Sequence, residues 1–221
     1  MEQHSIEWYK ARLGKITGSM VYSLMGTPRK KGEVWTDTAK SYLYELAAER
    51  RISETYLTTK FDEWLQRTNV ETWAMRYGTE TESQARDSYN MTLPDGLTVK
   101  ECGFIQYEGL QNYGDSPDGL VINANGEVER VLEIKCPNPA TWMRYKAEFA
   151  EGLTLKDIEP KYWWQVQSHM LATGCGVCDF VYFDKMLKDG LQVVSIEAND
   201  EDILLLREKI TAADEFINSL I

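Results

Sequence analysis

The spacing of apolar residues predicts helices toward both ends of the chain. Apolar positions three and four residues apart are typical of a helix that buries one face. Thr36 stands before such a segment as an N-cap, Gly78 precedes another, and Gly174 follows a third at the point where a helix would end. The predicted helices span residues 5–25, as two short helices joined by a turn, and residues 36–50, 57–75, 79–89, 140–151, 160–173 and 200–221.

The middle of the chain has the shorter period of β-strands. The predicted strands lie within residues 97–107, 120–122, 127–135, 179–183 and 192–197. Segment 114–119 is predicted to be a turn, and segment 26–32, which holds a proline and a basic run, an exposed loop. This order of elements predicts a mixed α/β fold, with a mixed central β-sheet flanked by helices.

The composition supports a single domain over residues 1–221. The chain is 43% hydrophobic and contains 7 Trp and 12 Tyr, which is enough to bury one substantial core. It has no apolar run as long as a membrane helix, and its first residues lack the basic and apolar regions of a secretion signal. The 4 cysteines are too few for a disulfide framework. We therefore expect a soluble, intracellular protein with reduced thiols and no membrane association.

The formal net charge of −11 argues at first sight against a nucleic-acid partner. Affinity for a polyanion comes from lysine and arginine contacts to phosphate. Basic residues nevertheless cluster at positions 10–15 and again at 29–31, while acidic residues gather in helical stretches such as 197–208. A local basic groove on an acidic protein is therefore compatible with the sequence.

Three charged residues form a pattern that is unusual for a core strand. Asp118 follows Pro117 in the predicted turn, and Glu133 and Lys135 lie in an otherwise apolar strand. Residues two apart on a strand project from the same face, so this carboxylate and this ammonium leave the sheet side by side. Charged groups in such a strand are costly unless they are paired or bound to a metal ion.

This pattern suits phosphodiester hydrolysis, which needs a metal-activated water and positive charge near the phosphate. Asp118 and Glu133 supply oxygen ligands of the kind that Mg²⁺ prefers, and the backbone carbonyl of Ile134 is a further candidate ligand. Lys135 would position the attacking water and stabilise charge. The plainer alternative, a surface turn and a salt bridge at a strand edge, accounts for each piece taken singly.

These residues match the signature of the PD-(D/E)xK nucleases. The chain resembles the phage lambda-type exonucleases, the viral recombination alkaline exonucleases, over nearly its full length. The matching segments are residues 8–19, 77–86, 116–119, 132–137 and 162–167. Five ordered segments are a stronger signal than the nuclease signature alone, and the resemblance implies a restriction-endonuclease-like core.

The resemblance adds two residues to the reaction centre. Glu82 corresponds to an additional acidic residue near the metal ions, although Glu80 is an equal candidate from the sequence alone. Gln165 corresponds to a glutamine that orients the water together with Lys135, and Gln167 is the alternative.

The resemblance also implies contacts to DNA. Arg12, Ser19 and Ser116 correspond to a pocket for the terminal 5′ phosphate, and a guanidinium fork with two hydroxyl donors suits such an anion. Arg29 corresponds to a loop arginine that enters the minor groove, and Met75 to an apolar wedge that parts the strands. Taken alone, each of these residues has an ordinary structural explanation.

The function implied by the resemblance is a deoxyribonuclease that digests linear double-stranded DNA from the 5′ end toward the 3′ end. It would leave a 3′ single strand for recombination by a single-strand annealing protein. We expect two Mg²⁺ ions, with Mn²⁺ as a substitute, and a ring-shaped homotrimer. The resemblance places such a protein in the cytoplasm of a bacterial host, encoded by a phage or prophage.

Two other functions remain open at this stage. The same core could serve a structure-specific or site-specific endonuclease. Alternatively, a degenerate domain with a charge of −11 could act as a non-catalytic DNA mimic or assembly protein. Cys175 and Cys178 have zinc spacing but no further ligands in sequence, and His169 in an aromatic helix is expected to be a core residue.

Overall fold

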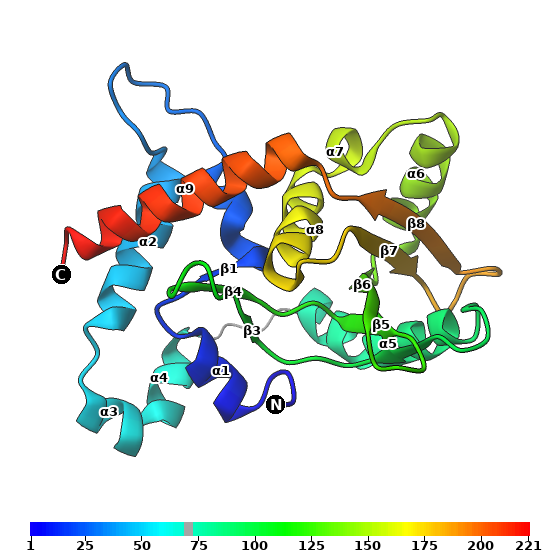
Figure 1. Cartoon of the computed structure of the whole chain (residues 1–221), viewed down its shortest axis with the longest axis horizontal. Coiled ribbons are helices and arrows are strands. Elements are labelled where there is room, and N and C mark those ends of the chain that lie inside the picture. Colours follow the sequence, from blue (N-terminus) through cyan, green and yellow to red (C-terminus); the bar gives the residue numbers. More distant parts are fainter. Residues whose placement is uncertain (69–72) are drawn as a thin grey trace.

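A computed structural model of the chain describes residues 1–68 and 73–221, and for residues 73–75 it describes the backbone alone. The helices in these residues are α1 (Ile6–Arg12), the 3₁₀ helix η1 (Gly18–Leu24), α2 (Asp37–Arg50), α3 (Glu54–Thr59), α4 (Phe61–Thr68), α5 (Trp73–Asn90), α6 (Pro139–Ala150), α7 (Leu155–Ile158), α8 (Pro160–Thr173) and α9 (Asp200–Asn218) (Figure 1). The strands are β1 (Ile16–Thr17), β2 (Thr98–Lys100), β3 (Ile105–Gln106), β4 (Tyr113–Asp115), β5 (Gly119–Ile122), β6 (Val128–Lys135), β7 (Val177–Phe183) and β8 (Leu191–Glu197).

Local sequence signals place the ends of the best-predicted helices. The hydroxyl of Thr36 accepts a hydrogen bond from the backbone N–H of Ala39 and so caps the first turn of α2. Helix α8 ends at Gly174, whose φ of 72° lies in the left-handed region that glycine adopts at little cost. Both boundaries confirm the sequence prediction.

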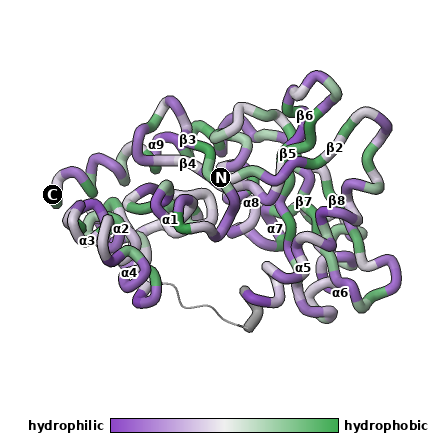
Figure 2. Tube along the Cα trace, turned by 90° about the horizontal axis from the view of Figure 1, so that it is seen from below, coloured by the Kyte–Doolittle hydropathy of each residue, from purple (hydrophilic) through white to green (hydrophobic). Residues whose placement is uncertain are grey.

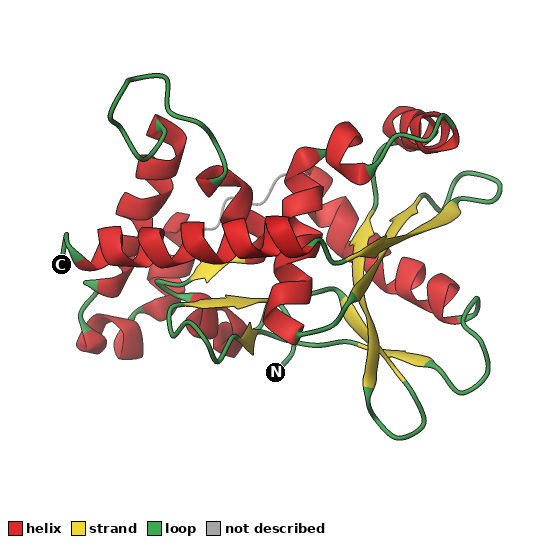
Figure 3. Cartoon of the chain, turned by 45° about the horizontal axis from the view of Figure 1, so that its top comes forward, coloured by secondary structure: helices red, strands yellow, loops and turns green. Residues whose placement is uncertain are grey.

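The strands form two sheets. The larger sheet has five strands in the order β2-β5-β6-β7-β8, and the smaller has three in the order β1-β4-β3. Within the larger sheet β6 and β7 are parallel, and its other pairs are antiparallel. In the smaller sheet β1 pairs with β4 in parallel, so residues far apart in sequence become neighbours. Figure 3 shows the larger sheet at one end of the molecule, with α5 across one of its faces.

The central strand β6 buries both of its faces. Leu132 and Ile134 pack with Ala85 and Tyr89 of α5, whereas Val131 on the opposite face belongs to the core formed with α6, α7 and α8. Figure 2 shows hydrophobic stretches where β5, β6 and β7 run together, and hydrophilic positions along much of α4. Glu133 and Lys135 alternate with the α5-facing residues and therefore project toward α8.

A second core lies under α9. This helix crosses α2 and α8 (Figure 1), and its buried residues Leu206, Ile210 and Ile217 pack against that core. None of the helices in the described ranges is both long and apolar enough to cross a lipid bilayer. The mixed α/β fold with helices flanking mixed sheets confirms the predicted fold class.

Four predictions about elements were wrong. The helix predicted over residues 57–75 is interrupted at Lys60, which separates α3 from α4, and part of that range lies outside the described residues. Gly78 lies inside α5 and does not precede it, because a helix can bear the modest cost of one interior glycine when its other residues pack. Segment 114–119 is a turn only at 116–118, since Gly114 and Asp115 belong to β4 and Gly119 begins β5. The second of the two short N-terminal helices is a 3₁₀ helix that follows the two-residue strand β1.

Candidate active site

Glu133 and Lys135 lie side by side on β6, as predicted. The Lys135 ammonium donates to Glu133 Oε1 and lies 4.9 Å from the ring centre of Tyr162 on α8. Burial alone would raise the pKa of Glu133, but the charges of Lys135 and His169 outweigh it and hold the pKa at about 2. Burial would lower the pKa of Lys135, but the charge of Glu133 raises it above its usual range. The pair is therefore ionised.

Asp118 is held against β6 by the backbone. Its Oδ2 accepts a hydrogen bond from Ile134 N at 2.6 Å, and its own N–H donates to Leu132 O at 3.0 Å. Loss of hydration, followed by the charges of Glu133 and Glu82, raises the pKa of Asp118 well above its usual value. Ile134, proposed as a ligand through its carbonyl, contributes its N–H to this contact.

Glu82 reaches the same region from α5. It forms an ion pair with Arg86, and its pKa is raised mainly by burial. The charges of Glu133 and Lys135 both act on Glu82, which places its carboxylate near theirs. Glu80, the alternative in sequence, is exposed.

One face of α8 covers the β6 pair. Tyr162, Gln165 and His169 follow at helical spacing, and His169 contacts Glu133 while Tyr162 contacts Lys135. Gln165 is only 8% exposed and shares this face. Gln167 points elsewhere: its amide bonds to Glu197 O and Asn199 N, so it ties α8 to the connection before α9.

His169 is a site residue that sequence reasoning missed. Its side chain is fully buried, with Nε2 2.6 Å from Glu133 Oε2 and Nδ1 3.0 Å from Asp115 Oδ2. Burial would lower the pKa of His169, but the two carboxylates outweigh burial and raise it to about 10. The imidazolium thus joins two carboxylates in the interior. Its position four residues after Gln165, on the same helical face, was the signal available in sequence.

The structure brings Arg12, Ser19 and Ser116 together, as the resemblance implied. Arg12 donates to Ser116 Oγ at 3.1 Å and to Ser19 Oγ at 3.4 Å, and its guanidinium lies 4.2 Å from the ring centre of Trp8. Trp8 Nε1 also donates to Ser116 Oγ, at 3.0 Å. All three predicted residues are half-buried.

Asp115 lies directly behind this cluster. Its Oδ1 accepts from Ser116 N at 2.8 Å, and its Oδ2 accepts from Ser168 Oγ at 2.7 Å. Burial lowers the pKa of Arg12, while the charge of Asp115 partly opposes this effect. A Cβ atom on Gly18 would lie only 1.9 Å from Asp115 Oδ2, so a close approach of the backbone requires glycine there.

The remaining predicted residues lie apart from this cluster or cannot be placed. Arg29 is exposed in the loop between η1 and α2. The side chain of Met75 lies outside the described residues. Cys178 is buried in β7 and Cys175 is half-buried, and both are free thiols.

The donors at the site suit a hard divalent cation in kind. Burial, and after it the charges of Glu133 and Glu82, raise the pKa of Asp118, and a cation would relieve the repulsion among these carboxylates. Within the described ranges, however, no three His, Cys, Asp or Glu side chains are grouped closely enough to hold one ion. Lys135 and His169 form ion pairs with Glu133, and Arg86 forms an ion pair with Glu82. A cation would have to compete with these partners.

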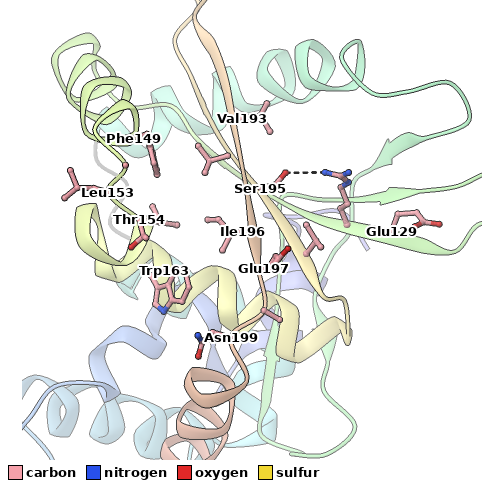
Figure 4. Close-up of a pocket in the computed structure, with 16 residues that line it drawn as sticks. Glu129, Phe149, Leu153, Thr154, Trp163, Val193, Ser195, Ile196, Glu197 and Asn199 are labelled. Atoms are coloured by element: carbon pink, nitrogen blue, oxygen red, sulfur yellow. Dashed lines mark hydrogen bonds between the residues drawn. The ribbon is translucent and has the colours of Figure 1, made fainter.

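A separate groove of about 1160 Å³ lies between β8 and the connection from α6 to α7. Its lining includes Phe149, Leu153, Trp163 and Ile196, which Figure 4 labels. None of the predicted site residues lines it. The groove is therefore distinct from the candidate site.

Comparison with known proteins gives a consistent result. Residues 7–176 match the family described as the YqaJ-like viral recombinase domain. The fold is similar to an alkaline exonuclease from Laribacter hongkongensis, also solved in complex with dAMP, at a TM-score of 0.74 and 30% identity, covering 97% of this chain and 93% of that one. A phage-related exonuclease from Haemophilus somnus 129PT has the same fold at a TM-score of 0.64 and 21% identity, with 96% of each chain covered. No curated protein matches the chain by sequence.

Proposed function

Because the chain belongs to the YqaJ-like viral recombinase family and is a deoxyribonuclease of the alkaline, lambda-type exonuclease class, we propose that it digests linear double-stranded DNA from 5′-phosphorylated ends. Digestion would run from 5′ to 3′ and depend on Mg²⁺, which Mn²⁺ could replace. The product would be a 3′ single-stranded overhang, the substrate of a single-strand annealing protein.

One observation carries this proposal. Ser116, which Arg12 contacts at 3.1 Å, stands two residues before Asp118, whose carboxylate is anchored on β6 beside Glu133. The cluster proposed to bind a phosphate thus adjoins the carboxylates through a single short turn. A terminal phosphate bound by Arg12 would bring a nearby phosphodiester to the carboxylates, which supports attack from a DNA end.

Each residue has a physical role in this proposal. Bound Mg²⁺ would activate water and neutralise charge on the phosphate. Asp118 and Glu133 would hold the cation together with substrate phosphate oxygens and waters, since Mg²⁺ usually takes only one or two protein carboxylates. Glu82 and the Ile134 backbone would be further ligands. Lys135 would orient the attacking water and stabilise the charge that develops on the phosphate.

The other residues would bind and orient the substrate. Gln165, on the α8 face over β6, would assist Lys135 in orienting the water. Arg12, Ser19 and Ser116 would hold the terminal phosphate, because a guanidinium and two hydroxyls supply several donors to one anion. Arg29 would contact the DNA groove and Met75 would separate the strands.

The test is digestion of a linear duplex labelled at either end, with MgCl₂ or with EDTA. We expect stepwise loss from the 5′-phosphorylated end that requires Mg²⁺ and falls at least about a hundredfold in Lys135→Ala. Lys188→Ala, which removes an exposed lysine from the turn before β8, is the matched control and should digest like the parent.

The alternatives predict different results. Cutting of closed circular DNA would favour an endonuclease. Binding without turnover by a folded protein would favour an assembly role, and loss from the 3′ end would contradict the proposed polarity. We propose in addition a single nuclease domain, two metal ions and a homotrimeric ring in a bacterial cytoplasm, and mass photometry of the purified protein tests the trimer.

A further inference from the structure

His169 connects the two halves of the candidate site. Its Nε2 lies 2.6 Å from Glu133 Oε2 and its Nδ1 lies 3.0 Å from Asp115 Oδ2, with all three side chains almost completely buried. Asp115 belongs to β4 in the smaller sheet, and Glu133 to β6 in the larger one. This single imidazole therefore links the two sheets through their buried carboxylates.

The two ends of this link lie at the two parts of the candidate site, the Arg12 cluster and the Glu133–Lys135 pair. On one side, Asp115 Oδ1 accepts from Ser116 N at 2.8 Å, and the charge of Asp115 acts on Arg12. On the other side, the second oxygen of Glu133 is bound by Lys135. A series of hydrogen bonds and ion pairs thus runs from the Arg12 cluster to Lys135. Its contact between His169 Nδ1 and Asp115 is an ion pair, in which Nδ1 makes no hydrogen bond within the described residues.

The link has little freedom to rearrange. Ser168 Oγ holds Asp115 Oδ2 at 2.7 Å, and the Gly18 backbone leaves no room for a Cβ atom beside that carboxylate. Ile134 N anchors Asp118 next to Glu133. In a buried network with fixed members, a change of charge at one end alters the hydrogen bonds at the other.

We propose that His169 is a positioning residue that couples the 5′-phosphate pocket to the cation-binding carboxylates, so that a terminal phosphate strengthens cation binding. This inference rests on the proposed function of the Arg12 cluster. A phosphate neutralises part of the charge of Arg12, and Asp115 then interacts more strongly with His169. The interaction of His169 with Glu133 then weakens, so that more of the negative charge of Glu133 is available to bind the cation.

Binding free energies make the coupling reciprocal: if a phosphorylated end tightens Mg²⁺ binding, Mg²⁺ must tighten binding of the phosphorylated end by the same factor. The test measures the affinity of the protein for a short duplex with a 5′-phosphate or a 5′-hydroxyl end. A phosphorothioate at the first linkage slows cleavage. Each affinity is measured with MgCl₂ and with EDTA.

For the wild-type protein we expect MgCl₂ to raise the affinity ratio of phosphate to hydroxyl ends by about fivefold or more. His169→Gln, which keeps hydrogen-bonding groups but loses the cation, should reduce this Mg²⁺ effect to a factor near one. Thr173→Ala is the matched control: it removes a hydrogen bond to the backbone oxygen of His169 near the end of α8 but leaves both carboxylate contacts of the imidazole. It should retain the coupling within about twofold.

The outcomes separate this inference from the function on which it rests. A wild-type protein without any preference for phosphorylated ends would overturn the phosphate pocket and the coupling together. A preference for phosphorylated ends that is independent of Mg²⁺ would contradict the coupling alone. This measurement uses only the wild-type protein, so it does not depend on whether a variant folds. Equal loss of coupling in Thr173→Ala and His169→Gln, or wild-type coupling in folded His169→Gln, would contradict the role of His169.

Discussion

Arg86 donates a hydrogen bond from its Nε atom to the backbone oxygen of Asp118, at 3.1 Å. The same guanidinium forms the ion pair with Glu82 and lies 3.3 Å from Glu101. One side chain of α5 therefore holds two carboxylate residues of the candidate site, one by its backbone and one by its side chain.

Replacing Arg86 by alanine should lower the rate of DNA digestion about 10- to 100-fold, the usual loss when a residue that orients metal ligands is removed. The backbone of Asp118 and the side chain of Glu82 would both lose their support. Digestion rates over a MgCl₂ titration provide the measurement. Arg144→Ala, which breaks an exposed ion pair with Glu148 on α6, is the control. An Arg86→Ala protein as active as the control would contradict the role.

Replacing Arg12 by lysine should abolish most of the preference for 5′-phosphorylated ends. Lysine keeps the positive charge but cannot contact Ser19 and Ser116 together through a planar fork. Charge-assisted hydrogen bonds contribute about 1.5–3 kcal/mol, so we expect the ratio of kcat/KM for phosphate and hydroxyl ends to fall at least about tenfold. Lys10→Ala removes an exposed charge from the same helix and should preserve the ratio. An unchanged ratio in Arg12→Lys would place the phosphate elsewhere.

Replacing Gly18 by alanine should reduce the free energy of unfolding by about 1–3 kcal/mol, the usual cost of overpacking. The new Cβ atom would meet Asp115 Oδ2 at 1.9 Å. Gly78→Ala is the matched control, because its Cβ would meet nothing within 4 Å inside α5, and it should be neutral or slightly stabilising. Urea unfolding of the parent, Gly18→Ala and Gly78→Ala proteins measures the three free energies of unfolding. Equal stability of Gly18→Ala and the parent would mean that Asp115 can move freely.

Alkylation of Cys102 in the folded protein should be slow at pH 8. Burial and then the charges of Asp118 and Asp115 raise the pKa of this thiol to about 12. Because only the thiolate reacts, the rate should rise about tenfold per pH unit between pH 8 and 10. The folded pKa exceeds the unfolded one, so ionisation of this thiol destabilises the fold as pH rises. Peptide mass spectrometry in EDTA follows the reaction, with urea-denatured protein as reference. A rate that levels off near pH 9 in the folded state would refute the raised pKa.

The sequence was sufficient for elements that local signals define. Helix α2 begins after the Thr36 cap and α8 ends at Gly174, because each signal acts within a few residues. The pairing of β1 with β4 could not be predicted from the sequence. These strands are 2 and 3 residues long and join positions about a hundred residues apart, so no local period marks them.

Only part of the candidate site could be predicted from the sequence. Strand geometry alone places Glu133 and Lys135 on one face, and the ion pair confirms this placement. The gathering of Arg12 with Ser116 came only from family resemblance. Nothing in the sequence indicated that His169 meets Asp115, because this contact needs α8 to lie across both sheets.

The turn at residues 116–118 limits the distance between the two parts of the proposed site. It is the covalent connection between Ser116 at the proposed phosphate pocket and Asp118 at the proposed cation site. Consecutive Cα atoms are about 3.8 Å apart, so the Cα atoms of these two residues can never be more than about 7.6 Å apart. Product length would then be set by the protein backbone itself, and lengthening this turn by insertion should change the size of the fragments released.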